Sequence, residues 1–316
     1  MAPQVPPLRP GRRIEGVSAL LLPYTSAGRV DMDGHSRLIE RTFDAGLTPA
    51  VNMDTGFVNL LTRDERRAVL TATSGVARGR AFVAGAFIEG DSGPPAALYR
   101  REAEAIRAAG GTPILFPCSA LSDRDEKGLF DVFQEVAEAG APLLAFELGT
   151  MFVPFGRLFS LDLFSRLLEV PAFVGLKHSS LDRGREWERL AVRDSRRPDF
   201  KIYTGNDLAV DMAFYGSDYL LGLSSFWPEA FAARDRLWAA SDVRAFALND
   251  LLQYLGFLAF REPVPAYRHS AAQFLHLRGV IEGDGVHPLA PRRDHGDVAL
   301  LAEIRERIDR LLESLP

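Results

Sequence analysis

Lysine is scarce in this chain of 316 residues, which contains only Lys127, Lys177 and Lys201 and takes all its other basic side chains from arginine. Lys127 lies in a charged turn, and Lys201 opens an apolar run where a strand would enter from solvent. Lys177 alone follows five residues without a polar side chain, 172–176. Burial lowers the pKa of a lysine, and the neutral amine can attack a carbonyl group to form a Schiff base. Lys177 is therefore a candidate nucleophile; the alternative is a lysine that reaches solvent or pairs with an acid.

Cysteine is rare, and long apolar runs and an excess of basic charge are absent. The single cysteine, Cys118, excludes an internal disulfide framework and is typical of a reducing compartment, so we expect a cytoplasmic protein. No apolar run approaches the roughly 18 residues of a membrane span, and residues 1–13 lack the apolar segment of a secretory signal. The net charge is −5, and no cluster of basic residues is flanked by aromatic ones. These features disfavour a nucleic-acid or membrane partner.

Patterns typical of metal and nucleotide sites are absent too. The histidines at 269, 276, 287 and 295 do not have the spacing of zinc ligands, so we expect no metal. Cys118 has no evident histidine partner and is interpreted as a core residue. No Gly-x-Gly-x-x-Gly follows the first apolar run, which argues against an open, doubly wound sheet that binds a dinucleotide.

From residue 17 onwards, short apolar runs alternate with amphipathic stretches. The apolar runs span 17–22, 48–53, 81–85, 112–116, 142–147, 172–177, 200–204 and 219–223. The helical stretches span 32–45, 62–76, 95–109, 127–139, 161–169, 182–193, 208–215 and 228–240. Eight strand and helix pairs in this length predict an α/β protein with a closed (β/α)8 TIM barrel over 15–240.

The ends of the chain differ from the barrel repeat. Residues 1–14 are rich in proline and predict a flexible N-terminal arm. Residues 241–316 contain three helical stretches without a strand between them, which predicts a C-terminal three-helix extension. The expected helices span 243–260, 265–278 and 297–315. Their aromatic and aliphatic residues (Leu251, Tyr254, Leu255, Leu258 and Phe260) exceed what packing on one barrel needs, so we expect a homo-oligomer.

The active site of such a barrel lies at the carboxyl ends of its strands. Strand alternation there places Phe173, Gly175 and Lys177 on the inner face and Ala172, Val174 and Leu176 on the outer one. His178 then points away from the site. Glu147 interrupts an apolar strand, and it is either a buried functional acid or the partner of a nearby arginine. The other candidates at these strand ends are Asp54, Thr55, Gly56, Ser119, Phe146, Asn206 and Gly222.

These residues resemble the dihydrodipicolinate synthase / N-acetylneuraminate lyase family of Schiff-base (β/α)8 enzymes. Gly175-Leu-Lys177 looks like the family's Gly-Ile/Val-Lys motif, which implies that Lys177 forms the imine. Asp54-Thr55-Gly56 looks like its Gly-Thr/Ser-Thr-Gly-Glu signature, which implies a site for the substrate. Further similar stretches are Ala19–Pro23, Gly28–Asp31, Leu61–Glu65 and Gly205–Asp207. The resemblance covers about residues 15–240 and implies dimers or tetramers and no cofactor or metal.

The chain departs from the family pattern at several positions. Asp54 replaces a hydroxyl residue of the signature, and Phe57 replaces its glutamate. Phe146 stands where the family has the strand-five tyrosine that relays protons, and Ser119 lies near a second tyrosine position. The arginine that follows strand five in many members falls near residue 150, where this chain has none. Dihydrodipicolinate synthesis itself is therefore in doubt.

The leading hypothesis is a lyase in which Lys177 forms a Schiff base with a 2-oxo acid such as pyruvate, and which makes or breaks a carbon–carbon bond or dehydrates its substrate. Glu147, Ser119 or a bound water would then replace the missing phenol as acid and base. The rival is a catalytically inactive family member that serves as a small-molecule binding or structural protein. A third hypothesis keeps the imine but takes a carbonyl substrate without a neighbouring carboxylate, which Asp54 would tolerate better.

Overall fold

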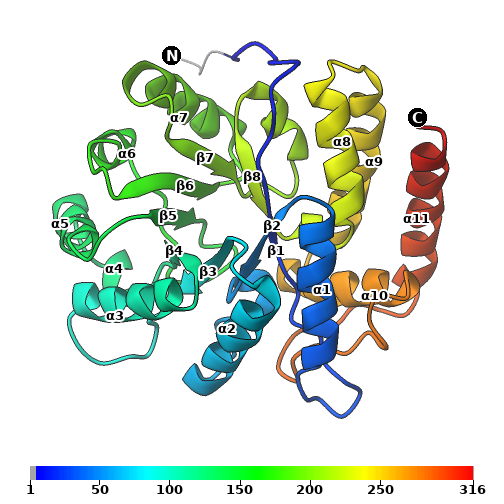
Figure 1. The fold of residues 1–316 in the computed structure, drawn as a ribbon, viewed down its shortest axis with the longest axis horizontal. Helices are drawn as coiled ribbons and strands as arrows, with labels where there is room; N and C mark the ends of the chain where they lie inside the picture. Colours follow the sequence, from blue (N-terminus) through cyan, green and yellow to red (C-terminus); the bar gives the residue numbers. More distant parts are fainter. Residues whose placement is uncertain (1–4, 316) are drawn as a thin grey trace.

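Eight parallel strands close into a barrel in the computed structural model, which describes residues 5–315 (Figure 1). The strands are β1 (Gly16–Ala19), β2 (Thr48–Val51), β3 (Phe82–Ala86), β4 (Gly111–Leu115), β5 (Leu143–Leu148), β6 (Phe173–Ser179), β7 (Lys201–Thr204) and β8 (Asp218–Leu221). Each strand pairs with the next along the chain, and β8 closes the barrel on β1. The predicted TIM barrel is confirmed.

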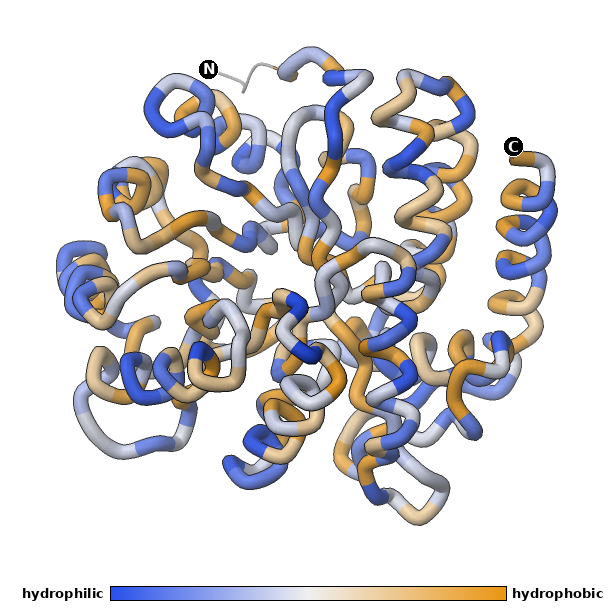
Figure 2. Tube along the Cα trace, viewed as in Figure 1, coloured by the Kyte–Doolittle hydropathy of each residue, from blue (hydrophilic) through white to orange (hydrophobic). Residues whose placement is uncertain are grey.

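Helices surround the barrel in the expected order. They are α1 (Met32–Asp44), α2 (Arg63–Ala77), α3 (Pro95–Ala108), α4 (Ser119–Ser122), α5 (Glu126–Ala137), α6 (Leu161–Leu167), α7 (Arg183–Arg196) and α8 (Pro228–Ala239). The crossover from β7 to β8 differs from the prediction, because Val210–Tyr215 forms the 3-10 helix η2 and not an α-helix. Figure 2 shows apolar residues recurring along the helices with hydrophilic residues between them, as expected for helices that cover a sheet.

Local sequence explains where these helices begin. Asp31 caps α1 by accepting a hydrogen bond from the N–H of Gly34 at 2.8 Å. Thr62 and Glu65 form a reciprocal capping box at the start of α2. This capping fixes where the chain turns from the carboxyl end of β2 into α2. The residues between β2 and α2, which include the short 3-10 helix η1 (Asp54–Gly56), are therefore held at the mouth of the barrel.

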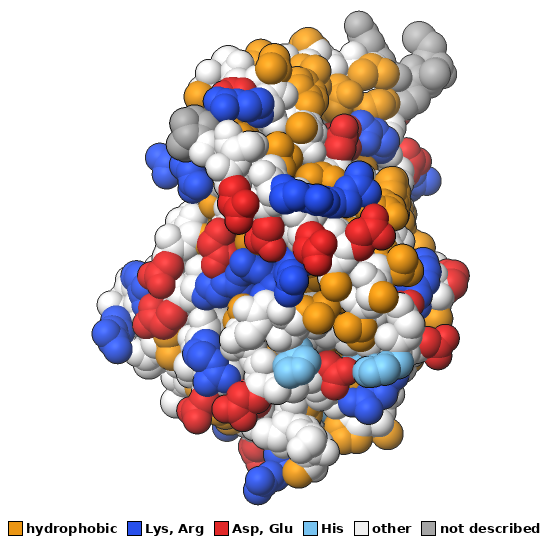
Figure 3. Space-filling view, turned by 90° about the vertical axis from the view of Figure 1, so that its right-hand side faces the viewer, with side chains coloured by type: hydrophobic (Ala, Val, Ile, Leu, Met, Phe, Trp, Pro, Cys, Tyr) orange, Lys and Arg blue, Asp and Glu red, His pale blue; other side chains and the backbone are white. Residues whose placement is uncertain are grey.

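The C-terminal part of the chain is helical, as predicted. It contains α9 (Arg244–Ala259), α10 (Tyr267–Leu277) and α11 (Asp297–Glu313). Helices α8, α9 and α11 pack side by side along one edge of the barrel (Figure 1). On that edge, basic and acidic side chains alternate with apolar ones, and neither sign of charge dominates (Figure 3).

The N-terminal segment follows the amino ends of the strands. Residues 1–4 of the predicted flexible arm lie outside the described part of the chain. In the described part, Arg12 binds Asp218 and the carbonyl oxygens of Ala213 and Ser217, while the N–H of Arg9 donates to Phe214 O. Residues 9–12 are therefore anchored to the barrel, which corrects the expectation of a loose arm for this stretch.

Candidate active site

Lys177 lies inside the barrel near the carboxyl end of β6. Its side chain is 7% exposed, and its Nζ lies 4.5 Å from the centre of the Phe146 ring. The described part of the chain gives Nζ no hydrogen bond or ion pair. Phe146 belongs to an apolar wall, since its ring makes an edge contact with Phe116, which in turn contacts Phe87. The amine therefore sits over an aromatic surface without a direct counter-ion.

Strand β6 does not alternate strictly, which corrects part of the sequence-based prediction. The pairing of β5 with β6 shifts between Leu143 and Leu144, so that Leu143 pairs with Phe173 and Leu144 with Gly175. Because of this irregularity Phe173 packs outward in the layer between the sheet and the helices, and Val174 lines the barrel interior. Beyond the shift the alternation resumes, and Lys177 points inward as predicted.

Burial sets the charge state of the lysine. It lowers the pKa of Lys177 from an ordinary value of 10.5 to about 8, although the nearby carboxylates of Asp207 and Asp54 act in the opposite direction. Desolvation outweighs attraction because neither acid forms an ion pair with the amine. A fraction of the lysine is therefore a neutral nucleophile near neutral pH.

Two residues of α10 bind the Asp54 carboxylate, and one of them, Arg268, neutralises its charge. Arg268 donates from Nη2 to Asp54 Oδ1 at 2.6 Å, and the hydroxyl of Tyr267 lies 2.8 Å from Asp54 Oδ2. The same hydroxyl lies 3.0 Å from Thr55 Oγ1. All four side chains are buried. Asp54 therefore does not present an uncompensated charge that would repel an anionic substrate.

Asp207 is a second buried acid of the site. Its Oδ1 accepts a hydrogen bond from the N–H of Leu223 at 2.7 Å, which ties the end of β7 to the end of β8. Burial raises the pKa of Asp207 to about 7, while the Leu223 N–H and the charge of Lys177 oppose this shift. A carboxyl group with such a pKa can exchange protons close to neutral pH.

Two glycines allow the site to close around these side chains. A Cβ atom on Gly205 would lie 2.0 Å from Ser179 Oγ and 2.8 Å from Cε of Lys177, so any larger residue would displace these side chains. A Cβ atom on Gly222 would lie 2.8 Å from Thr55 Oγ1 and 3.3 Å from the Tyr267 ring. The lysine therefore packs against the end of β7, and the hydroxyl groups pack against the end of β8.

Glu147 does not belong to this site, and its prediction as a catalytic acid is wrong. Its carboxylate points outward and binds Arg189 Nε at 2.7 Å, Arg189 Nη2 at 2.9 Å and His178 Nδ1 at 2.5 Å. It also accepts the N–H of Phe159 at 2.7 Å. Burial would raise the pKa of Glu147, but His178 and Arg189 outweigh burial and lower it. Glu147 is instead the partner of a nearby arginine, Arg189, which was the alternative interpretation of the sequence.

Two further predicted residues have structural partners elsewhere. Ser119 is exposed, and its hydroxyl and N–H both donate to the carboxylate of Glu89, at 2.6 and 2.7 Å. Asn206 holds a turn, since its Oδ1 accepts the N–H of Leu208 at 3.1 Å. Gly56 lies within η1 beside the carbonyl oxygen of Leu20. The structure thus brings Lys177 together with Phe146, while Ser119 is held apart by Glu89.

An arginine does follow β5, later in the loop than the sequence comparison placed it. Arg157 pairs through its backbone with Leu148, the last residue of β5. Its Nη1 donates to the carbonyl oxygen of Leu121 at 3.1 Å and that of Ser122 at 3.3 Å. The guanidinium therefore fastens this loop to α4.

Sequence reasoning did not select Asp207 as a site residue, although it placed this residue in the turn at the end of β7, and it missed Tyr267 and Arg268. Asp207 could have been identified from the sequence, because it lies two residues after Gly205 in the turn at the end of β7. Tyr267 and Arg268 carried no such signal, since they open a helix of the C-terminal extension, more than 210 residues from Asp54.

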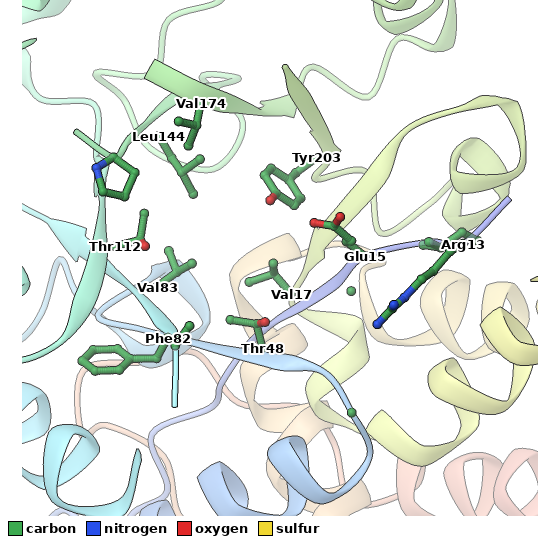
Figure 4. Close-up of a pocket in the computed structure, with 15 residues that line it drawn as sticks. Arg13, Glu15, Val17, Thr48, Phe82, Val83, Thr112, Leu144, Val174 and Tyr203 are labelled. Atoms are coloured by element: carbon green, nitrogen blue, oxygen red, sulfur yellow. The ribbon is translucent and has the colours of Figure 1, made fainter. Parts of the chain in front are cut away.

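A separate cavity of about 440 Å³ lies at the amino ends of the strands (Figure 4). Its lining includes Glu15, Thr48, Val174 and Tyr203 and does not include Lys177. Within residues 5–315 no three histidine, cysteine, aspartate or glutamate side chains cluster as metal ligands would. None of the described helices combines the length and the apolar character needed to cross a bilayer.

Known proteins resemble this chain over most of its length. The 4-hydroxy-tetrahydrodipicolinate synthase of Gluconobacter oxydans is 29% identical over 258 residues, which cover 79% of this chain and 82% of that protein. The enzyme of the same name from Bartonella quintana is 27% identical over 281 residues, 87% of this chain and 92% of the relative. The comparison confirms the resemblance to the dihydrodipicolinate synthase / N-acetylneuraminate lyase family. No protein-family model matches the sequence.

Solved structures of the dihydrodipicolinate synthase / N-acetylneuraminate lyase family share this architecture. Dihydrodipicolinate synthase from Agrobacterium tumefaciens matches with a TM-score of 0.76 at 25% identity, over 94% of this chain and 99% of that one. The enzyme from Acinetobacter baumannii, solved in complex with pyruvate, matches with a TM-score of 0.76 at 21% identity, over 94% of this chain and 99% of that one. At this identity the match shows only that the two proteins share a fold. Together these similarities indicate a Schiff-base-forming lyase.

Proposed function

We propose that the protein is a lyase in which Lys177 forms a Schiff base with a 2-oxo acid such as pyruvate or with a related carbonyl compound. The imine, once protonated, withdraws electrons from the adjacent carbon. That carbon can then take part in the making or breaking of a carbon–carbon bond, or in a dehydration.

The observation that supports this proposal most is the state of the Lys177 amine. With a pKa of about 8 in place of 10.5, the fraction of neutral amine near pH 7 is larger by roughly 300-fold. The amine faces the barrel interior and has no direct counter-ion within the described residues. It is therefore both available to a carbonyl carbon and deprotonated often enough to attack it.

The surrounding groups suit a small, anionic carbonyl substrate. Because Arg268 neutralises Asp54, the carboxylate of a 2-oxo acid does not meet an uncompensated negative charge at this position. We assign the substrate carboxylate to the first N–H groups of η1, which have no helical acceptor. Phe146 would pack against the apolar part of the substrate.

A non-catalytic binding role is the second candidate, and the Phe146 ring is the observation that favours it. This ring lies 4.5 Å from the amine and has no proton to transfer. A protein without an acid and base beside Lys177 could still bind a carbonyl compound without turning it over. Trapping and turnover therefore have to be measured separately.

The test is reduction by borohydride in the presence of a panel of 2-oxo acids and aldehydes, followed by intact mass and peptide mapping. We expect one reduced adduct per chain on Lys177, and none in Lys177→Arg, because arginine keeps the charge but does not deprotonate. Lys127→Arg is the matched control, since Lys127 is exposed and paired with Asp131. If the folded wild-type protein forms no adduct with any compound of the panel, the lyase proposal fails.

We further propose that the protein is a homodimer or homotetramer. Leu255 and Phe260, two of the residues from which the sequence predicted an oligomer, are buried within the chain and so do not support it. Val243, Phe246 and Phe257 on and beside α9 are instead exposed apolar side chains that a second copy could cover.

Light scattering checks the assembly. We expect a mass that is a multiple of 34.8 kDa at micromolar concentration, and a shift towards the monomer in Phe257→Asp. The control is Leu289→Asp, because Leu289 is also an exposed apolar residue but lies outside α9. A monomeric wild-type protein would contradict this proposal.

We keep the cytoplasmic location as a proposal. Cys118 is a free, buried thiol, and burial raises its pKa, which suits a reducing compartment but does not require one. Fractionation of cells that produce the protein, followed by immunoblotting, tests the location.

A further inference from the structure

We propose that Tyr267 is the phenol that moves protons during imine formation at Lys177. This inference rests on the proposed function, because it presumes that Lys177 attacks a carbonyl group. It adds a catalytic residue from the C-terminal extension to a site otherwise built by the barrel.

Imine formation at Lys177 requires protons at defined atoms. The neutral amine attacks the carbonyl carbon, a C–N bond forms, and the C=O π electrons move to oxygen. A proton then passes from nitrogen to this oxygen to give the carbinolamine. A second proton, supplied by a neighbouring acid, lets the oxygen leave as water while the nitrogen lone pair forms the C=N bond. The products are a protonated imine and one water, so the sequence needs one acid and one group that relays protons.

The hydroxyl of Tyr267 is placed within a chain of hydrogen bonds that can carry these protons. It lies 2.8 Å from Asp54 Oδ2 and 3.0 Å from Thr55 Oγ1. A phenol has only one proton, so when it donates to Asp54 the Thr55 hydroxyl donates to the phenol oxygen. A proton that reaches the Thr55 hydroxyl can pass to the phenol oxygen while the phenol proton passes to the Asp54 carboxylate, and the reverse shift returns it.

The tyrosine ring is held in a fixed position. It stacks on the ring of Phe260 at 4.2 Å between centres with an interplanar angle of 15°. Arg268, the next residue, donates from Nη2 to Asp54 Oδ1 at 2.6 Å and so fixes the carboxylate that the phenol faces. A relay group needs such fixed geometry more than it needs exposure.

Contacts at the ends of β7 and β8 link this chain to the nucleophile. Lys177 Cε packs against Gly205, and Thr55 Oγ1 and the Tyr267 ring pack against Gly222. Asp207 lies between the two glycines in sequence and accepts the N–H of the residue after Gly222. The charges of Asp54 and Asp207 act on both Lys177 and Tyr267, which places the amine and the phenol around the same two acids. In this arrangement Asp207 can supply the proton that departs with water.

The other groups considered for this role are unsuitable. Phe146 has no hydroxyl, Glu147 is occupied by Arg189 and His178, and Ser119 is held by Glu89. Tyr203 is the strand partner of Lys177, but its ring lines the cavity at the amino ends of the strands together with Glu15 (Figure 4). Burial, and after it the charge of Asp54, raises the pKa of Tyr267 well above its ordinary value. The phenol therefore stays protonated and acts as a shuttle.

The test compares Tyr267→Phe with the wild-type protein, using pyruvate as the probe. The reaction is quenched with borohydride at timed intervals, and the adduct is measured by intact mass. We expect the rate of imine formation to fall about a hundredfold, whereas the final extent of trapping stays within twofold. Phenylalanine keeps the ring that stacks on Phe260, so only the hydroxyl is lost. Tyr219→Phe is the control, because Tyr219 is a buried phenol that binds an aspartate outside the site, Asp235 of α8, and it should keep the wild-type rate.

The outcomes separate this inference from the proposed function. If wild-type protein traps neither pyruvate nor any other carbonyl compound, the proposed function fails and this inference with it. If wild-type protein forms the adduct and folded Tyr267→Phe forms it equally fast, only the inference is refuted. Should Tyr267→Phe not fold, Thr55→Val removes the neighbouring hydroxyl at almost constant volume and should slow imine formation about tenfold. An unchanged rate in that variant would likewise refute the relay.

Discussion

Replacing Lys177 by methionine should stabilise the protein near neutral pH. The wild-type fold holds an ammonium group in a site that lowers its pKa from 10.5 to about 8. Below pH 8 the lysine is charged in both the folded and the unfolded state, and the folded state bears the full cost of burying the charge. As the pH rises from 8 to 10.5 the folded state loses its proton first, so this cost declines and disappears.

The size of the effect follows from the difference of about 2.5 between the two pKa values. At about 1.36 kcal/mol per pH unit this difference corresponds to about 3 kcal/mol at pH 7 and to about 1.4 kcal/mol at pH 9.5. Methionine has a similar length and carries no charge, so Lys177→Met should be more stable than the wild type by about these amounts. The apolar wall around Phe146 should accept its side chain.

Urea unfolding of both proteins at several pH values between 6.5 and 9.5 measures this difference. The gap in the free energy of unfolding should shrink by about half between pH 7 and pH 9.5. Lys127→Met serves as the control, because Lys127 is exposed and should show no such dependence. A gap that stays constant over this range, or a wild type more stable than Lys177→Met at pH 7, would refute the reasoning.

Two further substitutions test the architecture around the nucleophile. Glu147→Gln leaves Arg189 buried without its counter-charge and should cost about 3 kcal/mol in urea unfolding. The folded variant should still be trapped by borohydride, and loss of trapping would return Glu147 to the active site. Gly205→Ala places a Cβ atom 2.0 Å from Ser179 Oγ and 2.8 Å from Cε of Lys177, so both side chains must shift and trapping should slow at least tenfold. Gly75→Ala, where an added Cβ meets nothing within 4 Å, should leave it unchanged.

The barrel could be predicted because the sequence patterns that define its strands and helices are local. Each strand is a short apolar run, each helix has an amphipathic pattern, and the order of the eight pairs decides how they assemble. The direction of Lys177 was predictable for the same reason, although the shift in pairing near Leu143 displaces the residues before it. Such an irregularity depends on how two strands fit and leaves no mark in either one alone.

The error at Glu147 could have been avoided from the sequence. Successive residues of a strand face opposite sides, so Phe146 and Glu147 could not both belong to the barrel interior. With Lys177 inside, the pairing of β5 with β6 places Phe146 beside it and Glu147 beside His178. Tyr267 and Arg268 were unpredictable in a stricter sense, because their approach to Asp54 depends on how the last helices dock.

The origin of Tyr267 and Arg268 in α10 has a consequence for biosynthesis. Asp54 enters the growing polypeptide more than 210 residues before the partners that neutralise it. A ribosome-bound chain that has completed all eight strands still holds a buried carboxylate without its guanidinium. We therefore expect the barrel to remain incompletely closed around this position until the final quarter of the chain has been synthesised and docked. Fragments released earlier would expose this face to chaperones and proteases, and imine-forming competence would arise as a late event of translation.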